Sequence, residues 1–279
     1  MKKILFILAV PAFLFALVLP SQLVNNDISE RLENVKQVSI DNTKWLFVIG
    51  VEEYDSIDPV AYASNSAKTF VTVMQKTQGI SERNSYILID DRATSGRIKS
   101  DMAKLLENVK EGDTIYFYYS GHGIPVIPSK DPYILPKDMT PAIVGLEEDF
   151  KLENIYKKLA SSNAAKVIAI VDSCFSGSTD GKSLFKGVAA SRLVAKKTKV
   201  DEAKMVVVTA GGGEEFSNMY KSKEHRLFSY FVMDALIDGK TDIESMYKST
   251  FKNVKDVSFK MGDQFIQRPT IEGNSKLSF

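Results

Sequence analysis

The sequence predicts an α/β protein with a mostly parallel sheet, because short continuous apolar runs alternate with longer segments of helical periodicity. Runs of this kind are typical of strands that are buried on both faces. Helical crossovers between successive strands make these strands parallel, so their carboxyl ends meet at one edge of the sheet. The predicted strands cover residues 45–50, 85–89, 114–119, 166–171 and 204–209. The predicted helices cover residues 61–78, 94–109, 150–160, 225–237 and 242–257.

The composition limits the classes of function. The 279 residues are enough for one large domain or two ordinary ones. The net charge of +1 gives no basic face for nucleic acid, so we expect no nucleic-acid partner. The single cysteine, Cys174, excludes a disulfide within the chain and a metal site built from several cysteines.

Residues 1–22 differ in composition from the rest of the chain. Lys2 and Lys3 precede an apolar stretch over residues 4–19, which Pro11 interrupts. A basic start followed by an apolar core predicts a signal for export. The stretch is longer than a usual signal core and shorter than the roughly 20 residues of a membrane-spanning helix. A cleaved signal peptide and a retained membrane anchor therefore both stay open, and we expect an exported protein that is periplasmic or faces the periplasm.

Three other segments lack a clear strand or helix pattern. Residues 23–42 are polar, and we interpret them as a spacer with a short helix at most, so that the folded domain begins near Lys44. Residues 125–141 hold five prolines, which predicts an irregular loop. Residues 180–203 are rich in lysine and small residues, and a loop of this length in a domain is usually functional or disordered.

Two segments carry the residues with the most chemistry. Tyr119-Ser-Gly-His-Gly123 follows one predicted strand, and Asp172-Ser-Cys-Phe-Ser-Gly177 follows the next. A lone cysteine is often only a small buried apolar residue, but Cys174 lies at the strand end where sites of parallel sheets form. A thiol becomes a useful nucleophile when an imidazole stands beside it. We therefore predict Cys174 as the nucleophile and His122 as its base, and we assign the other histidine, His225, a surface or helix-capping role.

The period of two along a strand extends this prediction. Ser120 projects to the same side as His122, and Asp172 projects to the same side as Cys174. We expect the Ser120 hydroxyl and the Asp172 carboxylate to line one cleft, where Asp172 could bind a cationic substrate side chain. The alternative role of Asp172 is local, because an aspartate at a strand end often accepts backbone N–H groups in a turn.

These motifs resemble those of the caspase-like cysteine peptidases, in particular the metacaspases and the bacterial metacaspase-like proteins. The segment around His122 is similar to the histidine motif of that group, and the segment around Cys174 is similar to its nucleophile motif. The likeness extends over residues 43–272 and includes 47–50, 225–230 and 267–269. It implies a caspase-like three-layer sandwich, with helices on both faces of a six-stranded, mostly parallel sheet. It also implies one peptidase domain over residues 43–279, divided into a large-subunit part (43–180), an exposed basic linker (181–203) and a small-subunit part (204–279).

The resemblance also implies roles for individual residues. His122 would act as general base, Cys174 would form a thioester, and the backbone N–H groups of Gly123 and Cys174 would form the oxyanion hole. The metacaspase pocket is acidic and accepts Lys or Arg, and Ser120 and Asp172 match positions of that pocket. Ser66 stands where the pattern has a second aspartate, so the pocket would hold one carboxylate. No arginine stands in an obvious place to bind an aspartate side chain.

The resemblance suggests self-processing and, for some relatives, calcium. The linker offers basic candidates for self-cleavage, although a solvated loop explains them equally well: Arg192, Lys196, Lys197 and Lys199. Calcium would need a cluster of oxygen ligands, for which Asp180 and the run Glu147-Glu-Asp149 are the candidates. The chemistry itself requires no cofactor, and we assign no metal ligand.

We therefore predict a cysteine endopeptidase that cleaves polypeptides after Lys or Arg, acts as a monomer and contacts a membrane only through an uncleaved N-terminal segment. The main alternative is a catalytically inactive caspase-like domain that serves as a binding or scaffold module in the cell envelope. A thiol hydrolase other than a peptidase, such as an amidase, has no separate support in the sequence.

Overall fold

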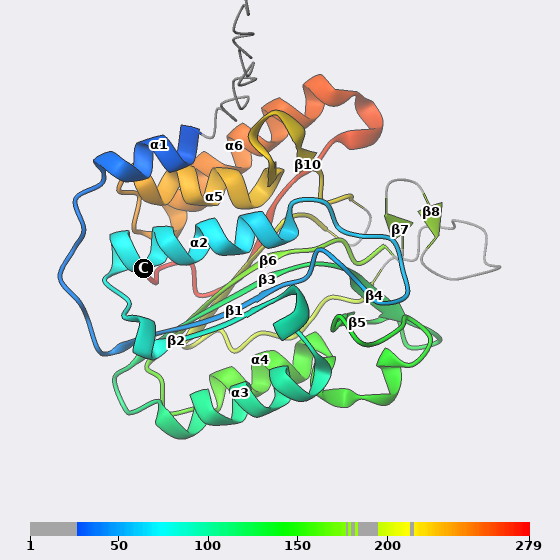
Figure 1. Ribbon diagram of the computed structural model, residues 1–279, viewed down its shortest axis with the longest axis horizontal. Helices are drawn as coiled ribbons and strands as arrows, with labels where there is room; N and C mark the ends of the chain where they lie inside the picture. The colour runs from blue at the N-terminus through cyan, green and yellow to red at the C-terminus, as the bar shows by residue number, and fades with distance from the viewer. Residues whose placement is uncertain (1–26, 177, 180–181, 184–194, 213–214) are drawn as a thin grey trace, which may run out of the picture.

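A computed structural model describes residues 27–176, 178–179, 182–183, 195–212 and 215–279. Its centre is a six-stranded sheet in the order β12-β9-β6-β3-β1-β2 (Figure 1). Five strands run parallel, and β12 pairs antiparallel with β9, so the predicted mostly parallel six-stranded sheet is confirmed. The strands are β1 (Lys44–Gly50), β2 (Ser85–Ile89), β3 (Thr114–Ser120), β6 (Lys166–Asp172), β9 (Met205–Thr209) and β12 (Thr270–Gly273).

Helices cover both faces of this sheet, which confirms the three-layer architecture (Figure 1). Alternate residues of β1 point to opposite faces, so Leu46 and Val48 join one apolar core while Phe47 and Ile49 join the other. The face of Leu46 is covered by α1 (Asp27–Asn34), α2 (Ala63–Gln78), α5 (Leu227–Ile237) and α6 (Ile243–Met261). The face of Phe47 is covered by α3 (Ser95–Asn108) and α4 (Leu152–Ala160).

The proline-rich segment is more regular than its sequence predicts. Residues 123–134 contain an antiparallel hairpin in which Pro125 stands opposite Pro132. Antiparallel strands exchange hydrogen bonds only at alternate pairs, so two residues without an N–H group are tolerated where they face each other. The prediction of an irregular loop over residues 125–141 is therefore wrong for the hairpin. Its strands are β4 (Gly123–Val126) and β5 (Asp131–Ile134).

Short elements complete the described part of the chain. The remaining strands are β7 (Ser178–Thr179), β8 (Lys182–Ser183), β10 (Met219–Tyr220) and β11 (His225–Arg226). The 3-10 turns are η1 (Glu82–Asn84), η2 (Asp90–Arg92), η3 (Val144–Leu146), η4 (Glu148–Phe150), η5 (Lys221–Lys223) and η6 (Asp263–Phe265). The helix predicted to open at His225 begins only at Leu227, because His225 pairs with Tyr220 in the hairpin of β10 and β11.

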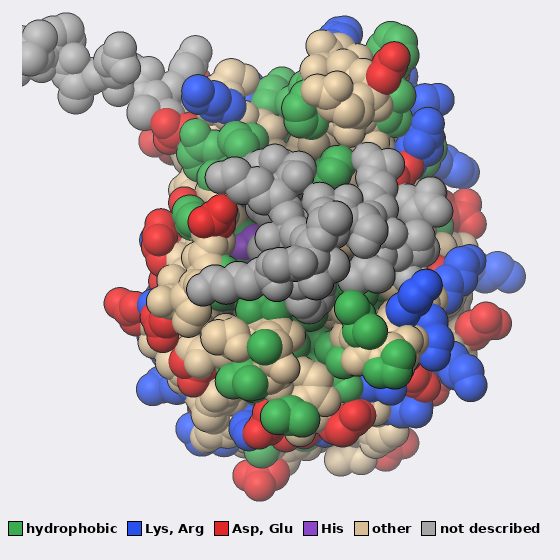
Figure 2. Space-filling view, turned by 90° about the vertical axis from the view of Figure 1, so that its right-hand side faces the viewer, with side chains coloured by type: hydrophobic (Ala, Val, Ile, Leu, Met, Phe, Trp, Pro, Cys, Tyr) green, Lys and Arg blue, Asp and Glu red, His purple; other side chains and the backbone are tan. Residues whose placement is uncertain are grey.

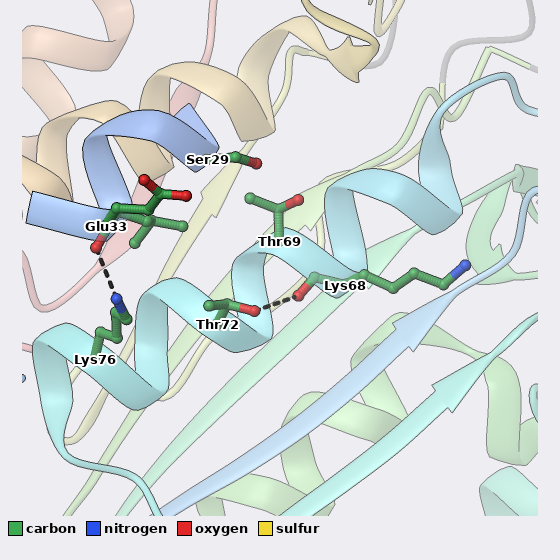
Figure 3. A pocket seen from close by; sticks show the side chains of 7 residues that line it. Ser29, Glu33, Lys68, Thr69, Thr72 and Lys76 are labelled. Atoms are coloured by element: carbon green, nitrogen blue, oxygen red, sulfur yellow. Dashed lines mark hydrogen bonds between the residues drawn. The ribbon is translucent and has the colours of Figure 1, made fainter. Parts of the chain in front are cut away.

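The segment predicted as a polar spacer contributes a helix to the fold. In α1, Ile28 and Leu32 are buried against α2 and α5, and Arg31 forms ion pairs with Asp234 and Asp238 of α5. Figure 3 shows the groove of about 290 Å³ where α1 meets α2. There the Lys76 Nζ donates a hydrogen bond to the Leu32 carbonyl at 2.8 Å. The packed domain therefore begins before Lys44 and includes residues 27–34.

Replacing Ile28 with alanine is expected to lower the free energy of unfolding by roughly 2–4 kcal/mol, because a buried isoleucine is truncated at a helix contact. The side chain of Ile28 has no solvent exposure, whereas its neighbour Ser29 is exposed. Urea unfolding of Ile28→Ala beside Ser29→Ala measures the difference. A loss no larger than that of Ser29→Ala would mean that α1 does not contribute to the stability of the domain.

The predicted signal peptide or membrane anchor over residues 1–22 lies outside the described residues. Within the described ranges, none of the helices combines the length and the apolar character that crossing a membrane requires.

Candidate active site

The carboxyl ends of β3 and β6 bring the predicted histidine and cysteine segments side by side. The two strands pair in parallel with Ser120 opposite Asp172, so each segment starts from the same level of the sheet. The two segments stay in contact beyond the strands, because the Ser173 Oγ donates a hydrogen bond to the Gly121 carbonyl at 2.8 Å. A Cβ atom on Gly123 would stand 2.6 Å from the Cys174 carbonyl oxygen, so only glycine allows this close approach.

Cys174 lies at the mouth of this site and is partly exposed. Its Sγ donates a hydrogen bond to the Glu215 carbonyl at 3.2 Å and lies 2.7 Å from the Ser176 Oγ. The Glu215 carboxylate binds the backbone N–H and the guanidinium of Arg268, which ties the loop after β9 to the C-terminal segment. The thiol is thus held by backbone and hydroxyl groups, with its proton directed at a carbonyl.

His122 is buried, and its ring orientation is fixed by a backbone carbonyl. The His122 Nε2 lies 2.8 Å from the Asp58 carbonyl oxygen, and a carbonyl only accepts hydrogen bonds. Nε2 therefore carries the proton of the neutral ring, and Nδ1 is the basic nitrogen. Burial, reinforced by the positive charge of Arg226, lowers the pKa of His122 to about 4. The imidazole is neutral at pH 7 and able to take a proton.

Two tyrosines hold the backbone of His122. The His122 N–H donates to the Tyr54 hydroxyl at 2.7 Å, and the Tyr119 hydroxyl donates to the His122 carbonyl at 2.5 Å. The Tyr54 ring also packs against the imidazole, with ring centres 4.8 Å apart. Burial raises the pKa of both tyrosines far above the usual range, so both keep their protons. The sequence carried no signal for Tyr54, which lies in an unpatterned loop after β1.

If His122 is the general base of a peptidase, its low pKa sets the acidic limb of the pH–rate profile. Because the ring stays neutral down to a pH of about 4, the acidic limb of kcat/KM is expected near that value and not near the ordinary histidine pKa of about 6.5. Measuring kcat/KM for a peptide between pH 3.5 and pH 8, with circular dichroism to monitor folding, locates the limb. A limb at or above pH 6.5 in folded protein would contradict the neutral buried imidazole.

The three predicted substrate-binding residues are all buried. The polar atoms of Asp172 and Ser66 already have partners in the protein, whereas the Ser120 Oγ has none among the described residues. Asp172 is 1% exposed and accepts hydrogen bonds from the Ser229 N–H at 2.9 Å, the Ser229 Oγ at 2.5 Å and the Ser217 Oγ. Ser66, in the first turn of α2, accepts from the Arg226 N–H at 2.9 Å. Ser120 is fully buried beside Asp172 in the sheet. The structure thus places Ser120 beside Asp172 and links Ser66 to Asp172 through Arg226 and Ser217.

Two residues of β11 lie in this region against expectation. His225 is fully buried with its Nδ1 3.3 Å from the Ser66 Oγ, so the prediction of a surface or capping role is wrong. Arg226 is 7% exposed, and its guanidinium donates to the carbonyl and the Oγ of Ser217. The sequence predicts no arginine in this region, because only the hairpin of β10 and β11 brings Arg226 to Ser217, which binds Asp172.

The predicted processing residues lie at the other side of the site. Arg192 lies outside the described residues. Lys196, Lys197 and Lys199 are exposed, and the Lys196 backbone N–H is bound to the Lys130 carbonyl at 2.9 Å. A groove of about 250 Å³ separates this segment from the sheet edge and contains Phe175, which follows the cysteine. Figure 2 shows basic side chains gathered on one side of this end of the molecule.

The candidate calcium ligands are engaged elsewhere or not described. Asp180 lies outside the described residues, and the carboxylates of Glu147 and Asp149 pair with Lys99 and Lys158. Glu148 accepts from the Tyr133 hydroxyl at 3.0 Å. In the described part of the chain, no three histidine, cysteine, aspartate or glutamate side chains gather in a way that could hold a metal ion.

Comparison with known proteins decides the family. The model of the caspase domain, peptidase family C14, matches residues 43–278. The chain belongs to the caspase domain family. Metacaspase-2 and metacaspase-3 of Trypanosoma brucei brucei are each 30% identical to it over 146 residues, which is 47% of this chain. The chain covers only 40% and 39% of the length of these relatives. The resemblance to caspase-like peptidases and metacaspases is thereby confirmed.

Solved structures agree on the fold. A crystal structure of a protein from Geobacter sulfurreducens matches with a TM-score of 0.59 and 17% identity, over 82% of this chain and 92% of that one. Caspase-1 from Spodoptera frugiperda matches with a TM-score of 0.57 and 16% identity, over 84% of this chain and 88% of that one. At this identity the likeness supports the caspase fold alone.

Proposed function

We propose that this member of the caspase family is a cysteine endopeptidase that hydrolyses peptide bonds with Cys174 as nucleophile and His122 as general base. The observation that carries the proposal is the parallel register of β3 and β6, which starts the histidine and cysteine segments at the paired residues Ser120 and Asp172. The contact between Gly123 and the Cys174 carbonyl supports it further, because the two segments remain adjacent beyond the strands.

The reaction begins with transfer of the Cys174 proton to Nδ1 of His122, whose Nε2–H is held by the Asp58 carbonyl. The thiolate attacks the peptide carbonyl, and the oxygen of the tetrahedral intermediate gains charge that the N–H groups of Gly123 and Cys174 stabilise. The intermediate collapses to a thioester as the imidazolium protonates the leaving amine. A water molecule, deprotonated by His122, then hydrolyses the thioester and restores the thiol.

The proposed substrates are polypeptides cut after Lys or Arg. The buried carboxylate of Asp172, with Ser120 and Ser66 beside it, supports a pocket that prefers a cation. Lys196, Lys197 and Lys199 are exposed, and an enzyme of this specificity would cleave after such residues. We therefore also propose that the protein cleaves itself within residues 181–203.

We extend the proposal to the location, the oligomeric state and the cofactor requirement of the enzyme. We propose that it acts as an exported monomer and that its chemistry needs no cofactor, with calcium as a modulator to be tested. Because neither a metal nor a cofactor takes part in the steps above, chelation by EDTA is expected to leave the rate of cleavage unchanged.

The experiment is a peptide panel with a covalent probe. Purified protein is incubated with fluorogenic peptides ending in Arg, Lys, Asp or Asn, with calcium or EDTA. A peptidyl acyloxymethyl ketone with a basic terminal residue is added in parallel, and mass spectrometry locates the adduct. Cleavage after Arg or Lys together with an adduct on Cys174 supports the proposal. Absence of both turnover and adduct would favour the inactive scaffold instead.

A further inference from the structure

A cation of the protein itself, the guanidinium of Arg226, lies one hydroxyl group away from Asp172, the predicted substrate-binding carboxylate. The backbone N–H of Arg226 donates to the Ser66 Oγ, and its Nη2 donates to the Ser217 Oγ at 3.0 Å. The Ser217 Oγ in turn donates to the Asp172 carboxylate. One arginine thus contacts Ser66 directly and Asp172 through a single hydroxyl group.

Asp172 has little capacity left for a second cation. Ser217 and Ser229 supply three hydrogen bonds to its two oxygens, and the side chain is 1% exposed. A carboxylate has about four lone-pair sites, so a substrate ammonium or guanidinium would have to displace one of these donors or share the charge with Arg226.

The guanidinium of Arg226 is held on one side and poorly satisfied on the other. Nη2 donates to both the carbonyl and the hydroxyl of Ser217, whereas Nη1 reaches the Ala61 carbonyl only at 3.4 Å. Nε is buried and has no acceptor among the described residues. A buried charge with an incomplete set of hydrogen bonds is costly, and the guanidinium has unused donor capacity at this place.

We propose that Arg226 is a specificity-determining residue whose guanidinium occupies the place where a substrate Lys or Arg would approach Asp172. A basic substrate side chain then meets a like charge and enters only when Arg226 moves aside, so Arg226 restrains cleavage after Lys and Arg. This inference rests on the proposed cysteine peptidase function and adds a restraint on its substrate choice.

The same arginine is less suited to bind an acidic substrate side chain. Its Nη2 is already committed to Ser217, and the residue is only 7% exposed, so an incoming carboxylate would find chiefly Nε. Asp172 lies one hydroxyl group away and would repel that carboxylate. The observations therefore indicate that Arg226 competes with substrate cations for Asp172, and they do not favour a binding site for anions.

The test compares Arg226→Ala, Arg226→Met and Arg226→Lys with Arg97→Ala, a control in which an exposed arginine of α3 is removed. Alanine removes the charge and opens space, methionine removes the charge and keeps apolar bulk, and lysine keeps a cation. For peptides ending in Arg or Lys we expect kcat/KM to rise about tenfold or more in Arg226→Ala, because a like charge is removed from the binding site. A smaller rise is expected in Arg226→Met, and Arg226→Lys and Arg97→Ala should stay near the wild type.

Three results would overturn the inference. One is an unchanged or lower kcat/KM for basic peptides in whichever of the alanine and methionine variants keeps a native melting temperature. Another is cleavage after Asp or Glu by the wild type that Arg226→Ala abolishes, because Arg226 would then bind substrate. The third is a rise in kcat/KM for basic peptides that is as large in Arg226→Lys as in Arg226→Ala. The positive charge at this position would then have no effect.

A binding measurement separates this inference from the proposed function. If no variant cleaves any peptide, the peptidase proposal fails, but the pocket can still be probed with methylguanidinium chloride. We expect this cation to raise the melting temperature of Arg226→Ala, or of Arg226→Met if alanine does not fold, and not that of the wild type. Equal shifts of the melting temperature in the variant and the wild type, or no shift in either, would contradict the inference that Arg226 occupies a cation-binding site.

Discussion

Replacing Cys174 with alanine is expected to lower kcat/KM for peptide cleavage by about 10⁴-fold or more, because the variant has no nucleophile to form the thioester. The fold should be unaffected. Cys174 is partly exposed, and among the described residues its Sγ makes hydrogen bonds only to the Glu215 carbonyl and the Ser176 hydroxyl, so alanine removes little buried apolar packing. The measurement is peptide turnover with the melting temperature recorded for each variant.

Ser176→Ala is the matched control for that experiment. Its hydroxyl lies 2.7 Å from the Cys174 Sγ but has no part in the proposed bond-making steps. We expect a much smaller loss of activity in Ser176→Ala than in Cys174→Ala. Turnover by Cys174→Ala equal to that of the wild type would exclude the thiol mechanism, whatever the control does.

The strand ends could be predicted from the sequence because their position follows from local patterns. The apolar runs before Ser120 and Asp172 are continuous and end abruptly, which fixes both the strand and its end. The period of two along a strand then assigns each side chain a side. The register makes Ser120 and Asp172 partners on adjacent strands, whereas their lining of one substrate cleft stays a prediction.

The partners of Asp172 could not be predicted in the same way, because tertiary contacts supply them. Ser217 and Ser229, which bind Asp172, and Arg226, which binds Ser217, lie more than forty residues along the chain, and only the folding of β10, β11 and α5 against the sheet brings them to this place. No local pattern distinguishes a buried Arg226 from an exposed arginine that opens a helix. The expected surface role of His225 was wrong for the same reason.

Helix α1 is a different case, since its signal was present in the sequence. Ile28, Leu32 and Val35 follow the spacing i, i+4, i+7 of one helix face, and the structure packs all three against the core. The polar character of residues 23–42 as a whole obscured this face. A short helix with one apolar stripe can belong to a domain even where the average composition is that of a linker.

The substitution Asp172→Ala is expected to lower the free energy of unfolding by roughly 3–5 kcal/mol, because it leaves several hydrogen-bond donors without their acceptor, each at a cost of about 1–3 kcal/mol when buried. The change leaves the donors of Ser217 and Ser229 without an acceptor and removes the carboxylate that Arg226 reaches through the Ser217 hydroxyl. Ser229 and Arg226 are buried, so water cannot readily replace the lost carboxylate there. Urea unfolding with a two-state fit measures the loss.

Asp101→Ala provides the comparison for Asp172→Ala, because Asp101 is also buried but pairs with the exposed side chains of Arg97 and Lys104. Those partners regain water when the carboxylate is removed, so a loss of about 1 kcal/mol or less is expected from the ion pairs. The double variant Asp172→Ala with Arg226→Met should be less destabilised than the sum of the single changes, because the unpaired cation leaves together with its anion. Equal losses in Asp172→Ala and Asp101→Ala, with additive effects in the double variant, would show that Arg226 and Asp172 do not depend on each other.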